Sequence, residues 1–284
     1  MAKYKLKYFS IHKNFDKFFI YYLLSLLIFG IFYLHYKHSV LNDSSISEYL
    51  INYQGGFVRR GLLGEIIYNF AIYFKLELRF AIFIFQSIFY AIFLFLIYNF
   101  FKNIEKNIII IFSILTPIFL LFPVAEIESL GRKEVVLYIY FLTLVNINNP
   151  KDANSFTLLF LPIVTLIYEE IVLFSGFIFA VLIIKNKINN FFSSFKIILL
   201  FVPSIFIVIF FLLSPLTIDD HKLMIDALML NFNETCYMSC NLLISNDITS
   251  FNHMLKYIWG DNELGKGSTK KYKKMNRRCT FGGV

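Results

Sequence analysis

Long runs of apolar residues alternate with short polar segments along this chain. Within each run the apolar residues are continuous rather than alternating, which is typical of α-helices and not of the strands of a membrane barrel. Several runs reach the 17 or more residues that an α-helix needs to cross about 30 Å of hydrocarbon. The pattern predicts an all-α fold, a polytopic bundle of about seven transmembrane helices. The predicted segments are residues 18–35, 80–101, 108–124, 135–147, 156–168, 171–184 and 197–216.

Three of these segments, 135–147, 156–168 and 171–184, contain only 13 or 14 residues. Segments this short cross a bilayer only if polar ends extend them, if the bilayer thins locally, or if they are broken within protein. We expect the last two to form a tight helical hairpin. Its turn would carry Glu169 and Glu170.

Composition agrees with a membrane protein, because 58% of the 284 residues are apolar, 36 are phenylalanine and the mean hydropathy is +0.65. Usage of this kind excludes an ordinary soluble domain. The first apolar run follows a lysine-rich start and so resembles a signal peptide. It is too long for one and lacks a small-residue cleavage site, so we interpret it as a retained first span.

The distribution of basic residues predicts the orientation in the membrane, because cytoplasmic loops are enriched in Lys and Arg. If the N-terminus is cytoplasmic, the inner segments carry 11 Lys or Arg in 43 residues, whereas the outer segments carry 9 in 102 residues. Of the 19 acids, 16 fall on the outer side. The predicted topology therefore has a cytoplasmic N-terminus and a large acidic and polar outer face, and the location that we expect is the inner membrane of a bacterium. The inner segments are residues 1–17, 102–107, 148–155 and 185–196; the outer ones are 37–79, 125–134, 169–170 and 217–263.

This topology divides the chain into a transmembrane bundle, residues 1–216, and an outer helical segment, 217–263. Residues 62–74 are too short for a span and contain Glu65, so they predict an amphipathic helix at the outer interface, within the large first loop 37–79. The tail, 264–284, carries seven Lys or Arg and no acid. Without the tail the net charge falls from +8 to +1, so basicity does not indicate a nucleic-acid partner. The tail is expected to be a truncated or frame-shifted end, or a headgroup-binding segment.

The stretch "GGFVRRGLLGE" in the first outer loop is the leading candidate for an anion site. A Gly-Gly turn would lead into a helix whose first turn carries Arg59 and Arg60. The positive end of that helix and two guanidinium groups would together favour a phosphate. The alternative is that both arginines reach lipid phosphates or pair with Glu65.

Carboxylates on the same outer side are candidates for a general base. Asp43 and Glu48 lie within thirteen residues of the first span, although Asp43 is equally suited to capping a short helix. In "EIESLGRKE", the spacing of Glu128 and Arg132 predicts a helical ion pair, which leaves Lys133 to meet an anion. In "IYEEIV", Glu169 and Glu170 interrupt apolar sequence and are functional candidates, or else form a plain turn.

The outer segment after the last span adds two further candidates. "IDDH" (Asp219, Asp220, His221) supplies ligands for a divalent cation, with a helix N-cap as the alternative, so the need for a metal is left open. Cys236 and Cys240 lie four residues apart and would form a disulfide on an oxidising face or remain free thiols.

Taken with an inner N-terminus and short, broken spans, these motifs resemble the GT-C class of integral-membrane glycosyltransferases. "GGFVRRGLLGE", "GRKE" and "YEE" are also similar to uncharacterised membrane proteins of bacterial surface-polysaccharide gene clusters, and the resemblance covers about residues 1–260. It implies a sugar donor linked to polyprenyl phosphate in the membrane lipid, used at the outer face. By position, Asp43 or Glu48 would be the catalytic base. The residues expected to bind the substrate phosphate are Arg59, Arg60, Arg132 and Lys133.

Three alternatives remain open at this point, and one of them, a purely structural membrane partner, would tolerate the loss of any single outer-face charge. A polysaccharide polymerase would use the same chemistry on polyprenyl-pyrophosphate-linked repeats, and a non-enzymatic transporter of lipid-linked sugars would need polar groups near the middle of the bilayer. Neither a nucleotide-binding P-loop nor the motifs of dehydrogenases, zinc proteases or serine hydrolases occur in the chain.

Overall fold

Helices make up most of the part of the chain that the computed structural model describes, and that part contains no strand. The described residues are 2–39, 44–102, 104, 108–116, 120–125, 129–188, 191–214, 216–236, 238–241 and 243. They all belong to one of two units, residues 1–244. The second unit, 245–284, lies outside the described residues, and so does the basic tail.

Three helical segments are long and apolar enough to cross a membrane. They are Phe15–His38 within α1 (Ala2–His38), all of α4 (Leu78–Lys102), and Ser194–Leu213. The last combines most of α10 (Phe191–Ile198) with η3 (Leu199–Phe201) and α11 (Val202–Leu213). These helices indicate a membrane protein, in agreement with the predicted fold class.

The other four predicted spans are shorter or interrupted, so the count of seven stays a prediction. Residues 108–124 do not form one helix, because α5 (Ile108–Leu115) ends before α6 (Phe122–Ala125) begins. The sequence here contains Pro117 and Pro123, and proline breaks a helix or begins a new one. Segment 135–147 corresponds to α7 (Glu134–Asn146), which has 13 residues.

The predicted hairpin corresponds to two packed helices and the turn between them. They are α8 (Pro150–Ile167) and α9 (Ser175–Asn186), joined by the 3₁₀-helix η2 (Glu169–Phe174). Asn149 caps α8 by accepting a hydrogen bond from the Lys151 amide at 3.1 Å, and Pro150 suits the first helical position. The turn carries Glu169 and Glu170, as the sequence predicts.

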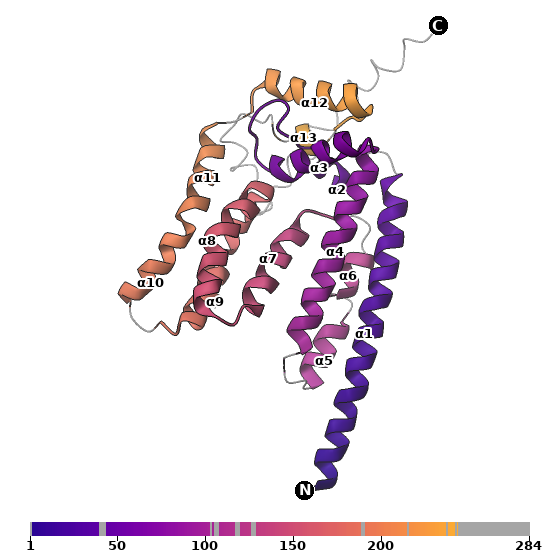
Figure 1. The fold of residues 1–284 in the computed structure, drawn as a ribbon, viewed down its shortest axis with the longest axis vertical. Helices are drawn as coiled ribbons and strands as arrows, with labels where there is room; N and C mark the ends of the chain where they lie inside the picture. The colour runs from indigo at the N-terminus through magenta and orange to yellow at the C-terminus, as the bar shows by residue number, and fades with distance from the viewer. Residues whose placement is uncertain are drawn as a thin grey trace, which may run out of the picture. The chain divides into compact units, whose positions relative to one another are not determined.

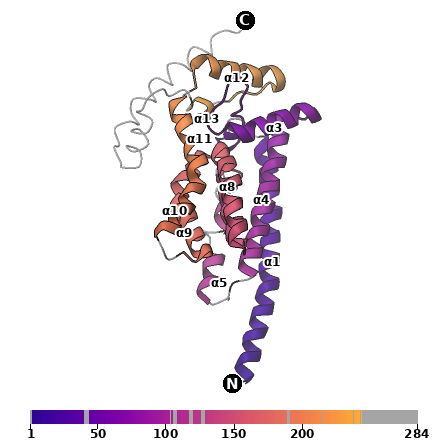
Figure 2. The ribbon, with the colours of Figure 1, turned by 60° about the vertical axis from the view of Figure 1, so that its left-hand side comes forward.

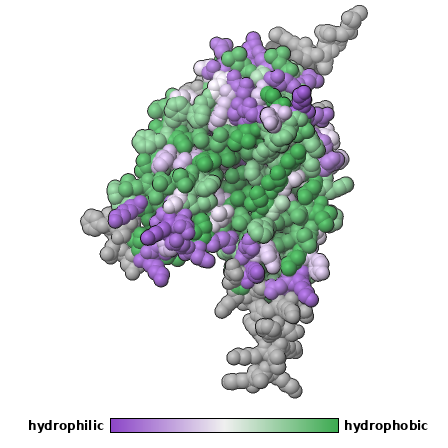
Figure 3. Space-filling view, viewed as in Figure 1, coloured by the Kyte–Doolittle hydropathy of each residue, from purple (hydrophilic) through white to green (hydrophobic). Residues whose placement is uncertain are grey.

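Helix α4 is central to the packing, with α1 against one side and α7 against the other (Figure 1). Gly30 of α1 allows a close approach, because a Cβ there would lie 2.3 Å from the Tyr90 ring of α4. Helices α7, α8 and α11 continue the bundle away from α1. The surface is apolar around the middle of the bundle and polar toward its ends, as a bilayer requires (Figure 3).

Four helices lie together at one end of the bundle, which we call the cap (Figures 1 and 2). They are α2 (Ser44–Tyr49), α3 (Gly61–Phe74), α12 (Ile218–Phe232) and α13 (Met238–Asn241). Helix α3 covers residues 61–74, where the sequence predicts an amphipathic helix, and it exposes Ile66, Ile72 and Tyr73. The described residues of the predicted outer segments 37–79 and 217–263 contain the cap helices, and Arg60 of the first segment pairs with Glu169 and Glu170 of the predicted turn 169–170.

A glycine, a disulfide and a hydrogen bond hold the cap together. A Cβ on Gly55 would lie 1.8 Å from the Asp220 carbonyl oxygen, so only glycine lets the loop before α3 pass this close to α12. Cys236 and Cys240 form a disulfide. Ser239, within α13, shares a hydrogen bond of 2.7 Å with Ser47 of α2.

Cysteine labelling tests which end of the bundle faces outward. Gln54 in the cap and Lys102 at the far end of α4 are both exposed. In a Cys279→Ser background, a membrane-impermeant maleimide added to intact cells should modify a cysteine at position 54 and not one at 102. Labelling at 102 alone would reverse the predicted orientation, and permeabilised cells, in which both positions should react, provide the control.

Candidate functional site

The motifs "RR", "GRKE" and "YEE", which lie far apart in the sequence, meet beneath the cap. They bring together residues from the end of α2, the turn before α3, the start of α7 and the turn η2. We call this group the charge network. Its members are Glu48, Arg60, Arg132, Lys133, Glu134, Tyr168, Glu169 and Glu170.

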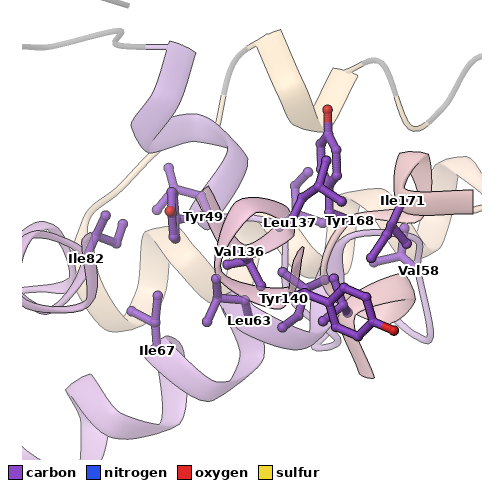
Figure 4. Close-up of a cluster of buried hydrophobic side chains, with 14 of the residues drawn as sticks. Tyr49, Val58, Leu63, Ile67, Ile82, Val136, Leu137, Tyr140, Tyr168 and Ile171 are labelled. Atoms are coloured by element: carbon purple, nitrogen blue, oxygen red, sulfur yellow. The ribbon is translucent and has the colours of Figure 1, made fainter. Parts of the chain in front are cut away.

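Residues of the charge network are adjacent in sequence to residues of an apolar core, part of which is drawn in Figure 4. Tyr49, which follows Glu48, and Tyr168, which precedes Glu169, are both buried in this core. Val58 and Ile171 are buried there as well, so the chain on both sides of the charged residues is fixed by packing. Rigid surroundings of this kind hold charged side chains in defined positions.

Arg60 lies immediately before α3, not in its first turn as the sequence suggested. Its φ of 62° is left-handed, and the Gly61 amide donates to the Val58 carbonyl at 3.3 Å across the turn. Helix α3 therefore begins at Gly61. The expectation was wrong because helical periodicity does not reveal a left-handed residue, which for arginine needs tertiary contacts to hold it.

Those contacts are ion pairs to the η2 turn. Arg60 Nε donates to both carboxylate oxygens of Glu169 at 2.9 Å, and Nη2 donates to Glu170 Oε1 at 2.6 Å. The guanidinium also lies over the Tyr168 ring, 5.3 Å from its centroid. The Tyr168 hydroxyl donates to the other Glu170 oxygen at 2.6 Å. Arg60 thus ties the turn before α3 to the hairpin.

Lys133 has no exposed surface, and it forms a hydrogen bond with the backbone of Arg60. Its Nζ donates to the Arg60 carbonyl oxygen at 2.6 Å and lies 5.6 Å from the centroid of the Tyr49 ring. Burial lowers the Lys133 pKa to about 7, an effect that Glu48 opposes and Arg60 reinforces. Lys133 is therefore placed to position the Arg60 backbone rather than to meet a ligand directly.

The lowered pKa of Lys133 predicts a pH dependence of stability. The unfolded chain holds the lysine proton up to its ordinary pKa of 10.5, and the folded chain releases it near 7. Between these values the unfolded state binds more protons, so the free energy of unfolding should rise with pH. We expect the melting temperature in detergent to increase from pH 7 to pH 10 and the increase to be smaller in Lys133→Met. Equal slopes in the two proteins would contradict this assignment.

Glu48 is the buried carboxylate of the network. Arg132 Nη2 lies 3.3 Å from Glu48 Oε1 and 2.8 Å from Glu134 Oε1. Glu48 Oε2 is buried and has no hydrogen-bond partner. Burial, and next the charge of Glu134, raise the Glu48 pKa, while Arg132 and Lys133 oppose the rise. A carboxylate with a raised pKa and an unoccupied oxygen is suited to accept a proton.

Four further residues were predicted in the first outer loop and in the loop before α7, and the structure describes two of them, Arg59 and Glu65. Arg59 is half-buried, and burial lowers its pKa while the charge of Glu169 opposes the fall. The Glu65 carboxylate accepts hydrogen bonds from the Tyr53 amide at 2.9 Å and from the side-chain amides of Gln54 and Asn69. Asp43 and Glu128 lie outside the described residues, so the proposed Glu128–Arg132 pair does too.

The "IDDH" stretch begins helix α12. The Asp220 amide donates to Thr217 Oγ1 at 3.1 Å and the Thr217 hydroxyl donates to Asp220 Oδ2 at 2.6 Å, so Thr217 and Asp220 form a reciprocal cap. Asp219 is exposed, and His221 is buried with Nε2 unpartnered. Among the described residues no group of three His, Cys, Asp or Glu could hold a metal ion. The structure therefore supports the capping interpretation.

Sequence reasoning did not single out two members of the network, Glu134 and Tyr168, or the neighbouring Tyr49. Each is adjacent to a residue that was singled out, so the signal was present in "EY", "KE" and "YE". A comparison with protein-family models, with curated proteins and with solved structures finds no match to this chain.

Proposed function

We propose that this protein is a membrane glycosyltransferase that takes sugar from a polyprenyl-phosphate donor at the cap. The observation that carries the proposal is Glu48, whose buried Oε2 has no partner within a network of three cations. Glycosyl transfer to a hydroxyl needs a base for the proton and positive charge for the departing phosphate. The network supplies both from one end of the bundle.

In the proposed reaction, an acceptor hydroxyl attacks the anomeric carbon of the donor sugar. The bond from that carbon to the phosphate oxygen breaks, and the hydroxyl proton passes to Glu48. Arg132 is the network cation with the most exposed side chain, at 45%, and so is the first candidate to contact the phosphate. Arg59 and Arg60 would complete the phosphate site, and Lys133 would position the turn that carries Arg60.

The ion pairs of Arg60 set a condition on this mechanism. A phosphate that binds the Arg60 guanidinium must displace Glu169 or Glu170, or else bind beside them. Glu170 is the more exposed of the two, at 36% against 17%, and is the one that a ligand can replace at lower cost. Displacing Glu170 would also free the Tyr168 hydroxyl to hydrogen-bond the phosphate.

The proposal is consistent with a bacterial inner-membrane location, a cytoplasmic N-terminus and about seven membrane-crossing segments, with the cap outside. Under this topology the short helices α7 and α9 would cross within protein, where α4 and α8 cover them. The charge network would then meet lipid-linked substrates at the outer edge of the bilayer. A transporter, in contrast, would need polar groups near the middle.

Transfer from a defined donor tests the proposal. The full chain in lipid nanodiscs would be given a radiolabelled sugar on polyprenyl phosphate or, separately, a repeat unit on polyprenyl pyrophosphate, each with a crude outer-surface polysaccharide acceptor. Transfer from the monophosphate supports the glycosyltransferase, whereas transfer from the pyrophosphate alone would support a polymerase. No transfer from either donor, with a panel of common sugars, would contradict both.

A further inference from the structure

An apolar cavity of about 330 Å³ lies between the α8–α9 hairpin and the last span. The hairpin contributes Ile171 and Phe179, and the last span contributes Phe201 and Ile205. This volume is about twice that of a cavity of about 150 Å³ that binds benzene. It also falls in the range of natural sites for small apolar ligands. The cavity is therefore large enough for a ligand.

Polar atoms in the cavity wall are few. Ser175 and Ser204 are the polar side chains of the lining, and Ser204 is buried with its hydroxyl unpartnered. Gly176 leaves additional room, because a Cβ at this position would meet no atom within 4 Å. The cavity is partly open to the outside, and a wall made almost entirely of hydrocarbon favours an apolar occupant over water. Its occupant must be apolar.

The position of the cavity decides what that occupant is. Of the three candidate spans, Ser194–Leu213 is the least covered by protein, with 17% of its apolar window buried against 28% and 33% for the others. Phe177 and Phe206, on the two elements that border the cavity, are exposed large apolar side chains, as is typical of helix faces that contact lipid. A helix about 10 Å across cannot enter a cavity of this volume, whereas one hydrocarbon chain can.

We propose that this cavity binds one acyl chain of a membrane phospholipid, which completes the packing of the last span against the hairpin. An unfilled void leaves the side chains of its wall without dispersion contacts on one side. An acyl chain in the cavity would supply those contacts. The bound chain acts as a structural part of the bundle. This inference is independent of the proposed function.

Photolabelling tests the proposal. The full chain would be placed in nanodiscs of phosphatidylglycerol that contain a trace of phosphatidylglycerol with a diazirine on one acyl chain, irradiated, and mapped by mass spectrometry. Phe201 lines the cavity and is only 7% exposed, so its labelling requires a chain inside. We expect label on Phe201, and its loss in Gly176→Trp, which fills the cavity.

The matched control is Phe177→Trp, the adjacent residue on α9, which does not line the cavity. Labelling of Phe201 should persist in this variant. Ser204→Leu provides a second filled variant if Gly176→Trp does not fold, as judged by size exclusion. Labelling unaffected by a folded filled variant, or absent from the unmodified protein, would overturn the proposal. In a competition experiment, unlabelled prenyl phosphate would be added in an amount equal to that of the photoreactive phospholipid. Loss of the label on Phe201 would then also overturn the proposal, since the bound chain would belong to the prenyl lipid.

Discussion

Replacing Glu48 with glutamine should lower sugar transfer by about 10²- to 10⁴-fold, the range that a general base contributes. Glutamine has nearly the same shape, and its carbonyl oxygen can still accept the hydrogen bond from Arg132 at Glu48 Oε1. What it loses is the ability to take a proton. The expected result is therefore a fall in kcat with little change in the abundance of the protein in membranes.

The control for this measurement is Glu77→Gln, which removes an exposed carboxylate at the start of α4. The pH profile gives a second readout, because only the ionised base is active. The rate should rise with pH through the raised pKa of Glu48, whose cause is burial and then Glu134. Normal transfer by the Glu48→Gln protein would exclude Glu48 as the base and leave Asp43 as the remaining candidate.

Replacing Arg60 with alanine should destabilise the protein more than any other single change in the charge network. The substitution removes three charged hydrogen bonds and leaves two partly buried carboxylates without their cation. One hydrogen bond to a charged group is worth about 1.5–3 kcal/mol, and the Arg60 side chain is 24% exposed, so we expect a loss of about 3 kcal/mol in all. Unfolding in mixed micelles would measure it.

Two companion variants separate the causes of that loss. Arg60→Gly removes the same contacts but relieves the left-handed backbone, so it should be less damaging than Arg60→Ala. Arg60→Lys keeps the charge but cannot reach Glu169 and Glu170 with a planar fork, so it should rescue only part of the loss. Full stability in the alanine variant would show that the ion pairs contribute nothing, and the double variant with Glu169→Gln should be less than additive.

The sequence was sufficient to predict the helical class, the hairpin turn and the helices of the cap. The continuous apolar runs predict the helical class. The positions of Glu169 and Glu170 between two such runs predict the hairpin turn. The number of spans was harder, because a run such as 108–124 has the composition of one helix and yet is divided between α5 and α6. Hydropathy measures what a segment can bury and not where its backbone turns.

The partners in the charge network could not be predicted for a related reason. Local spacing offers Glu65 to Arg60, whereas the observed partner is Glu169, which lies 109 residues away in the chain. Arg132 likewise reaches Glu48, which lies 84 residues away. Helical spacing rules apply only to residues on one helix. Pairing across helices depends on which turns meet beneath the cap, and this follows from packing of the apolar core around Tyr49 and Ile171.

In the proposed topology, the Cys236–Cys240 disulfide links the maturation of this protein to its insertion in the membrane. Disulfides form in oxidising compartments and are rare in the cytosol. Under this topology the bond would close only after the segment that follows the last span has been exported, so a chain inserted the wrong way round would keep two alkylatable thiols at the cap. The redox state of this cysteine pair would then report, for each molecule, whether the cap was placed outside.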